Sequence, residues 1–257
     1  MQLNQTVLII RKKCPQASWI YGILCCLLTS PTWASLNLPL TPVLALSAGP
    51  AFYHAGQTQN IQLQPHFSNT YVANTPQNAL SAGELFVGVQ RPITSWGWAQ
   101  LGVALVTTSY AQLQGHLWEN SDPLFDNFTY QYRITHAHVA LKTKWLTQAF
   151  SSTLFPYVSA SVGLARNRSS SFSTTALLFE EVPVPGFQNH TQQAFTYTLG
   201  IGIHKMANEH WQIGVGYDFG DWGASALARA PQQTMSNGLQ LNHLYTQQLV
   251  LTMNYLF

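Results

Sequence analysis

The chain has 257 residues and a formal net charge of +2, and only 8% of its residues are charged, against roughly 25% in an average soluble domain. Three of its 11 basic residues lie in an N-terminal leader, which leaves eight against nine acidic residues, a net charge of about −1. No basic surface remains for nucleic acid, and no apolar run reaches the roughly 20 residues of a membrane-spanning helix. The composition suits a membrane protein built from strands, in which only every second residue must be apolar.

The N-terminus has the three parts of an export signal. Three cations at residues 11–13 precede an apolar stretch at residues 19–28, which is too short to cross a bilayer. Residues 32–34, Thr-Trp-Ala, have the pattern of a cleavage site. We therefore assign residues 1–34 to a cleavable signal peptide.

The remaining chain divides into a short lead-in, residues 35–41, and one barrel domain, residues 42–257. All three cysteines (Cys14, Cys25 and Cys26) fall inside the leader. The exported chain then has no thiol for a disulfide, for nucleophilic catalysis or for a metal site.

Eight segments of this domain alternate apolar and polar residues with period two, as half-buried strands do. In chain order they cover residues 42–52, 81–90, 98–110, 128–144, 154–166, 193–204, 211–220 and 248–257. Each is close to or above the 9 to 11 residues that a tilted strand needs to cross a membrane. We expect an all-β fold, an eight-stranded antiparallel transmembrane β-barrel.

The connections between these segments alternate strictly in length. Short connections cover residues 91–97, 145–153 and 205–210, and long ones cover residues 53–80, 111–127, 167–192 and 221–245. Outer-membrane barrels have short turns in the periplasm and long loops outside the cell. The even number of strands places both chain ends in the periplasm.

Aromatic residues lie near both ends of the predicted strands, where interface girdles form in a membrane protein. Near the short turns these are Trp96, Trp98, Trp145, Trp211, Tyr255 and Phe257. Near the long loops they are Tyr110, Trp118, Tyr130, Tyr132, Tyr217 and Phe219. The last strand therefore ends on two interface anchors, Tyr255 and Phe257.

Four segments resemble the barrel domain of small bacterial surface proteins, the OmpA-like, OmpW-like and opacity-protein group. They are GPAFY (residues 49–53), GELFVGVQRPI (83–93), YVSASVGLARN (157–167) and GVGYDFGDWG (214–223). The resemblance implies a Gram-negative outer membrane, and it implies that Tyr255 and Phe257 form a C-terminal signal for the barrel-assembly machinery. Because nothing follows the eighth strand, we do not expect the peptidoglycan-binding domain of OmpA.

Six larger polar residues are predicted to face the barrel interior: Glu84, His136, His138, Lys142, His204 and Asp218. Buried charges must pair or be hydrated, so we expect Lys142 to pair with Glu84 or Asp218. Such a lumen is either a hydrogen-bonded plug or a narrow polar channel.

His136 and His138 lie on one strand face at a spacing that metal ligands use, but no third ligand is evident. His204 is followed by Lys205-Met206 and His243 by Leu244-Tyr245, so neither forms a recognisable His-x-Ser catalytic pair. We therefore expect no metal, no cofactor, no catalytic residue and no enzymatic activity.

The function favoured by this pattern is that of a surface-exposed structural or interaction protein acting through its long external loops. The alternatives are a small porin that passes ions or small molecules, and a lipid-modifying outer-membrane enzyme. The expected partners are outer-membrane lipids, lipopolysaccharide and a host or surface ligand, bound by a monomer. The apolar residues 176–179 and 182–185 of the third long loop either fold over the barrel mouth or contact such a partner.

Overall fold

The computed structural model describes residues 40–75, 77–148, 153–178, 186–231 and 233–257. The predicted signal peptide, and residues 179 and 182–185 of the third long loop, lie outside the described residues. Among the residues described, no helix has both the length and the apolar character needed to cross a membrane.

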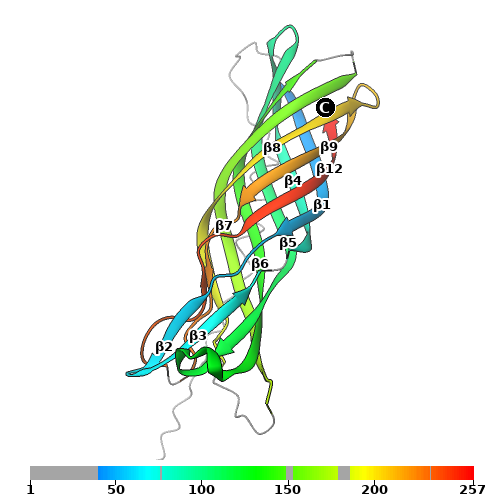
Figure 1. The fold of residues 1–257 in the computed structure, drawn as a ribbon. Helices are drawn as coiled ribbons and strands as arrows, with labels where there is room; N and C mark the ends of the chain where they lie inside the picture. Colours follow the sequence, from blue (N-terminus) through cyan, green and yellow to red (C-terminus); the bar gives the residue numbers. More distant parts are fainter. Residues whose placement is uncertain (1–39, 76, 149–152, 179–185, 232) are drawn as a thin grey trace, which may run out of the picture. The chain divides into compact units, whose positions relative to one another are not determined.

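Eight antiparallel strands of 11 to 23 residues form a closed ring (Figure 1). They are β1 (Thr41–Tyr53), β4 (Asn78–Thr94), β5 (Gly97–Trp118), β6 (Asp126–Thr147), β7 (Leu154–Ala176), β8 (His190–Met206), β9 (Trp211–Asp221) and β12 (Tyr245–Leu256). Each strand pairs with the next in this order, and β12 pairs back with β1 from Val43↔Leu256 to Tyr53↔Thr246. The predicted eight-stranded antiparallel barrel is confirmed.

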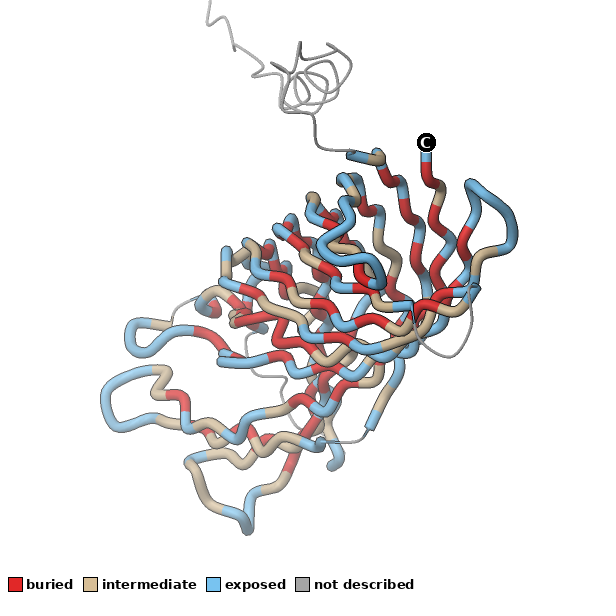
Figure 2. Tube along the Cα trace, turned by 90° about the horizontal axis from the view of Figure 1, so that it is seen from above, coloured by how far each residue is buried: buried red, intermediate tan, exposed pale blue. Residues whose placement is uncertain are grey.

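Around the middle of the strands, the outer surface of the barrel is apolar. Burial alternates residue by residue along the strands (Figure 2), and the exposed positions there are occupied by large aliphatic and aromatic side chains. These include Leu46, Val87, Leu101, Val103, Leu105, Val139, Leu141, Val162, Leu164, Leu199, Ile201, Ile213, Leu249 and Leu251, which are 44% to 72% exposed. A band of this kind is unstable in water and is stabilised by contact with lipid chains.

The connections differ in length as predicted, but the long ones are shorter and more ordered than expected. Residues 111–118, 126–127 and 167–176, which were predicted to be loop, continue β5, β6 and β7. The first long loop contains a hairpin of β2 (Gln59–Gln64) and β3 (Phe67–Asn74), and β3 pairs with the end of β5. The fourth contains β10 (Ser225–Ala226) paired with β11 (Gln240–Leu241). The prediction that these stretches are loops was therefore wrong.

The sheet thus continues past the apolar band on the long-loop side, and we call this part the external extension. It comprises residues 59–74, 110–135, 168–178 and 221–245 with the residues that pack on them. Inside it lies an apolar cluster that includes Ile61, Tyr71, Leu113, Leu117, Phe128, Tyr130, Tyr132, Ile134, Phe187, Trp222, Leu239 and Leu244. The external extension is therefore organised like a soluble domain, with its apolar side chains inward.

A β-bulge lets β5 place apolar side chains outward in the membrane band and inward in the external extension. Between Thr107 and Tyr110, β5 advances three residues while its partner β6 advances two. The odd-numbered residues face lipid before the bulge, as Leu105 does, and face the interior after it, as Leu113 does. The same shift occurs in β7 near Ser171, which has a φ of 57°.

Three aromatic residues assigned to the girdles face inward instead. Tyr130 and Tyr132 are buried in the apolar cluster of the external extension, and Trp98 packs edge-on against Phe155 at 5.3 Å in the short-turn end of the lumen. Burial raises the pKa of the hydroxyl of Tyr130, as expected for a dry environment. Membrane-interface placement was therefore the wrong prediction for these three.

The C-terminal strand closes the ring at the short-turn end. Phe257 is 66% exposed, its amide donates to the carbonyl of Pro42, and its ring contacts Tyr255 at 4.8 Å. Tyr255 in turn packs edge-on against Trp211 at 4.9 Å. The three rings form an aromatic patch on the outer surface at this end.

Candidate functional site

The centre of the lumen holds an ion-pair cluster. Lys142 donates to both carboxylate oxygens of Glu84, at 2.7 and 2.8 Å, and its Nζ lies 3.7 Å from Asp218 Oδ2. The Lys142 side chain is 5% exposed, and each carboxylate is 14% exposed. One cation of β6 thus links β4 and β9 across the barrel.

Small residues make room for this cluster. A Cβ atom on Gly200 would overlap the carboxylate of Asp218 and come within 2.6 Å of Ser159 Oγ. The small inward glycines and serines of β7 and β8 therefore leave the space that the long charged side chains of β4, β6 and β9 fill at the same level of the lumen.

The two neighbouring histidines join the barrel wall to the fourth long loop. His136 Nδ1 donates to Asn167 Oδ1 at 2.6 Å, so its Nε2 accepts from Nδ1 of His138, also at 2.6 Å. Asn167 donates to the backbone carbonyls of Trp222 and Ala224, at 2.9 and 2.8 Å. The Trp222 indole stacks on His136 at 4.6 Å with an interplanar angle of 8°. These contacts hold the start of the loop inside the barrel mouth.

His204 lies apart from that pair, at the short-turn end. Its Nδ1 accepts from Asn254, and its ring contacts Tyr157 at 4.5 Å, while Nε2 is buried with no hydrogen-bond partner in the described part of the chain. Lys144 Nζ lies 4.8 Å from the centre of the same tyrosine ring and 6.0 Å from that of Phe86. This end of the lumen is thus filled by aromatic rings with a second buried cation between them.

The structure gathers three of the six predicted lumen residues, Glu84, Lys142 and Asp218, into one cluster. His136 and His138 form a second group with Asn167 and Trp222, and His204 belongs to a third, so the six do not make one network. Across the described residues, no three histidine, cysteine or carboxylate side chains come together as metal ligands.

Several polar contributors were not identified from the sequence. Lys144 is 4% exposed and lies two residues from Lys142 on the same face, so strand alternation alone could have found it. Asn167 was placed at the start of a loop, and Trp222 lies in a connection for which no pattern indicates a fold inward.

Two histidine–aspartate pairs lie in the external extension. His243 Nδ1 is 2.7 Å from Asp221 Oδ2, and His116 Nδ1 is 3.1 Å from Asp126 Oδ2. Within the described chain, no serine, threonine or cysteine side chain is hydrogen-bonded to either imidazole. The first pair joins the fourth long loop to the end of β9, and the second joins the external ends of β5 and β6.

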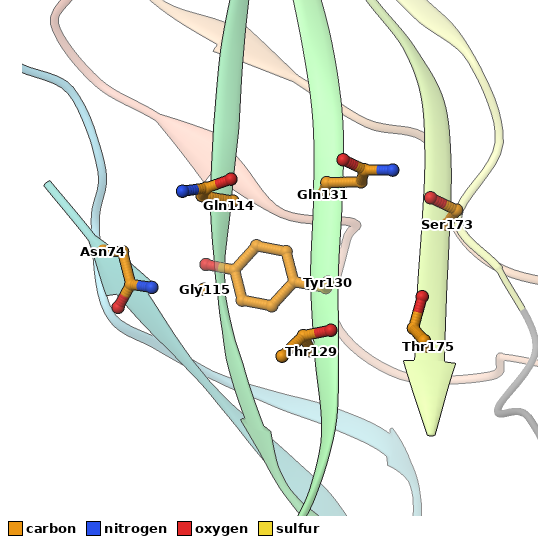
Figure 3. Close-up of a pocket in the computed structure, with 8 residues that line it drawn as sticks. All are labelled: Asn74, Gln114, Gly115, Thr129, Tyr130, Gln131, Ser173 and Thr175. Atoms are coloured by element: carbon orange, nitrogen blue, oxygen red, sulfur yellow. The ribbon is translucent and has the colours of Figure 1, made fainter. Parts of the chain in front are cut away.

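The outer surface of the external extension is polar and carries shallow pockets. One of them has a volume of about 290 Å³. Figure 3 shows that the Tyr130 ring extends across Gly115 in this pocket, among side chains from β3, β5, β6 and β7. The pocket shares Gln131 and Ser173 with a second pocket of about 330 Å³ nearer the membrane band. A third, of about 670 Å³, lies between the third and fourth long loops. We call the first two together the polar groove, because they are adjacent and both are lined by amide and hydroxyl side chains as well as aromatic rings.

A closed ring with an apolar outer band, a polar lumen and short turns at one end defines a class of protein. The chain is a transmembrane β-barrel of the outer-membrane type. Both the predicted fold and the predicted membrane location follow from this geometry.

No protein-family model and no curated protein matches the sequence. Among solved structures, the chain is similar to OprG from Pseudomonas aeruginosa, with 14% identity, a TM-score of 0.42, and coverage of 84% of this chain and 95% of OprG. Neisserial surface protein A shares 11% identity at a TM-score of 0.41, with 84% and 97% covered. Ail of Yersinia pestis shares 10% at 0.38, with 85% and 98% covered. At these values no role is transferred from them.

Proposed function

We propose that this protein is a non-conducting outer-membrane barrel that acts at the cell surface through its external extension. The observation that carries the proposal is the filled external mouth. Trp222 is 2% exposed, stacks on His136 and belongs to an apolar cluster to which the first, third and fourth long loops all contribute.

Two further groups of side chains that fill the lumen below the mouth support the same role. The Glu84–Lys142–Asp218 cluster occupies the middle of the lumen, and Trp98 and Phe155 pack together at the short-turn end. A porin instead keeps a hydrated path along its axis. The packed rings and the bidentate ion pair, which lie in series along the lumen, support a barrel without such a path.

The outer surface of the external extension offers the contacts that an interaction protein needs. Its pockets carry several amide and hydroxyl groups. In the pocket between the third and fourth loops, the amides of Gln188, Gln192 and Asn237 lie near Arg229. Hydrogen-bonding groups on a rigid sheet suit a polar ligand such as a glycan. We propose binding in place of catalysis, since in the described chain neither histidine–aspartate pair is hydrogen-bonded to a serine, threonine or cysteine side chain.

Planar-bilayer conductance tests the proposal. The mature chain, refolded in detergent and inserted into a bilayer, is expected to remain electrically silent. A Trp222→Ala variant is the matched probe, because it removes the ring that fills the mouth while leaving the barrel strands unchanged. Stable single-channel steps in the wild type would overturn the proposal, and larger steps in the variant would then assign the conduction to the lumen.

A further inference from the structure

Three arginines project from the outer surface of the barrel where the apolar band ends. Arg166 and Arg168 on β7 lie opposite Ala137 and Thr135 of β6, and Arg133 is the next outward residue along β6. All three are exposed. Leu164, which is 72% exposed, is the next outward residue of β7 on the lipid side. The arginines therefore mark the external boundary of the membrane band.

No acidic side chain of the described residues neutralises this group. In the described chain, none of the three guanidinium groups lies within 4 Å of a carboxylate. Arg133 instead lies over the ring of Tyr110, 4.4 Å from its centre, which orients the guanidinium at the surface. The result is an outward positive patch on a chain with few charges.

The other basic residues of the barrel lie elsewhere, so positive charge on the outer surface is concentrated at this boundary. Lys142 and Lys144 lie inside the lumen, Arg91 and Lys205 lie toward the short-turn end, and Arg229 lies in the fourth loop. Guanidinium groups bind phosphate oxygens in a bidentate manner. A patch of three at a membrane boundary therefore suits the phosphates of a lipid headgroup.

Directly beyond the arginines, the same strands carry the polar groove. Arg133 itself lines the lower pocket, together with Gln112, Gln131 and Ser173. Gln112 Nε2 donates to Gln131 Oε1 at 2.9 Å, which fixes both amides on the surface. The groove presents neutral hydrogen-bonding groups, as sugar hydroxyls require.

We propose that the outer face of β5, β6 and β7 is a binding site for a phosphorylated glycolipid of the outer leaflet. Acyl chains lie on the apolar band, phosphates on Arg133, Arg166 and Arg168, and sugars in the polar groove. This order of chemistry along the barrel is the order along such a lipid from tail to headgroup. The site deepens the proposed surface role, because it gives the external extension a lipid partner.

Lipid binding by the refolded mature barrel in micelles tests the proposal. The probes are lipopolysaccharide, diphosphoryl lipid A, phosphatidylglycerol and inorganic phosphate. Native mass spectrometry would count bound lipids, and competition with a fluorescent lipopolysaccharide would give affinities. The test variant is Arg133→Gln/Arg166→Gln/Arg168→Gln, and the control is Arg91→Gln/Lys205→Glu, which lowers the net charge by the same three units at the short-turn end.

The test variant is expected to lose affinity for lipid A by about fivefold for each arginine, on the order of a hundredfold in all. The control should bind as the wild type does. Equal losses in both variants, or equal competition by phosphatidylglycerol or inorganic phosphate, would overturn the proposal, because they indicate general attraction between charges.

The polar groove has its own test, since lipid A lacks the outer sugars of lipopolysaccharide. Gln114→Leu/Gln131→Leu should weaken binding of lipopolysaccharide severalfold and leave lipid A unchanged. Unchanged binding of both would remove the groove from the site. Conductance measured on the same preparation keeps the two proposals separate. A barrel that conducts ions and still binds lipid A would refute the proposal of a non-conducting barrel and leave the lipid-binding site standing.

Discussion

Removal of the central lumen cation should destabilise the barrel more than any loss of a surface charge. Lys142→Met leaves Glu84 and Asp218 inside the barrel without the ammonium group that lies within 4 Å of both. Two unit charges 4 Å apart interact by about 4 kcal/mol at an effective dielectric constant of about 20. Deleting one partner of a buried pair costs about 3–5 kcal/mol. We expect about 3 kcal/mol, because the carboxylates keep some exposure and Lys144 lies on the same face.

Urea titration of the refolded barrel, followed by tryptophan fluorescence, measures this change in the free energy of unfolding. Lys205→Met, which removes an exposed cation from β8, is the control and should change stability by less than about 0.5 kcal/mol. A neutral triple variant, Glu84→Gln/Lys142→Met/Asp218→Asn, should recover at least half of the loss. The reasoning is refuted if Lys142→Met matches the control, or if the triple variant is as unstable as the single one.

Three other predictions test the band, the lumen packing and the last strand. Val162→Arg should cost about 2–4 kcal/mol in lipid by urea titration, whereas Thr175→Arg in the external extension should be neutral, and equal effects would contradict the assigned band. Gly200→Ala should lower stability by about 1–3 kcal/mol, because the added methyl group displaces Asp218; an unchanged unfolding midpoint would argue against this packing. Deletion of Phe257 should lower the yield of heat-modifiable barrel in cell envelopes, and a normal yield would count against an assembly role.

The membrane part of the fold was predictable because one rule governs it. Lipid outside and a narrow lumen inside impose strict alternation, so Val103 and Leu141 could be assigned to the outer face from spacing alone. The pairing of Lys142 with carboxylates followed from the cost of leaving charges unpaired in a lumen. Local sequence and elementary electrostatics were sufficient there.

The external extension was not predictable by the same rule, because its environment is reversed. Leu113 and Leu117 continue the spacing of the lipid-facing residues, yet they face a core, and the outward positions beside them are polar. Likewise, Trp222 reaches the mouth of the barrel through contacts with β6 and β7, which are distant in sequence. Tertiary contacts of this kind leave no local pattern.

The bulge in β5 makes the length of this strand more important than its composition. Residues Thr107 to Tyr110 contain the single extra residue that separates two opposite solvent preferences. Deleting Ser109 would remove one small exposed side chain, but it would rotate Leu113 and Leu117 into water and turn their polar neighbours toward the core. Homologous proteins of this architecture should therefore accept many substitutions at this point and almost no insertions or deletions.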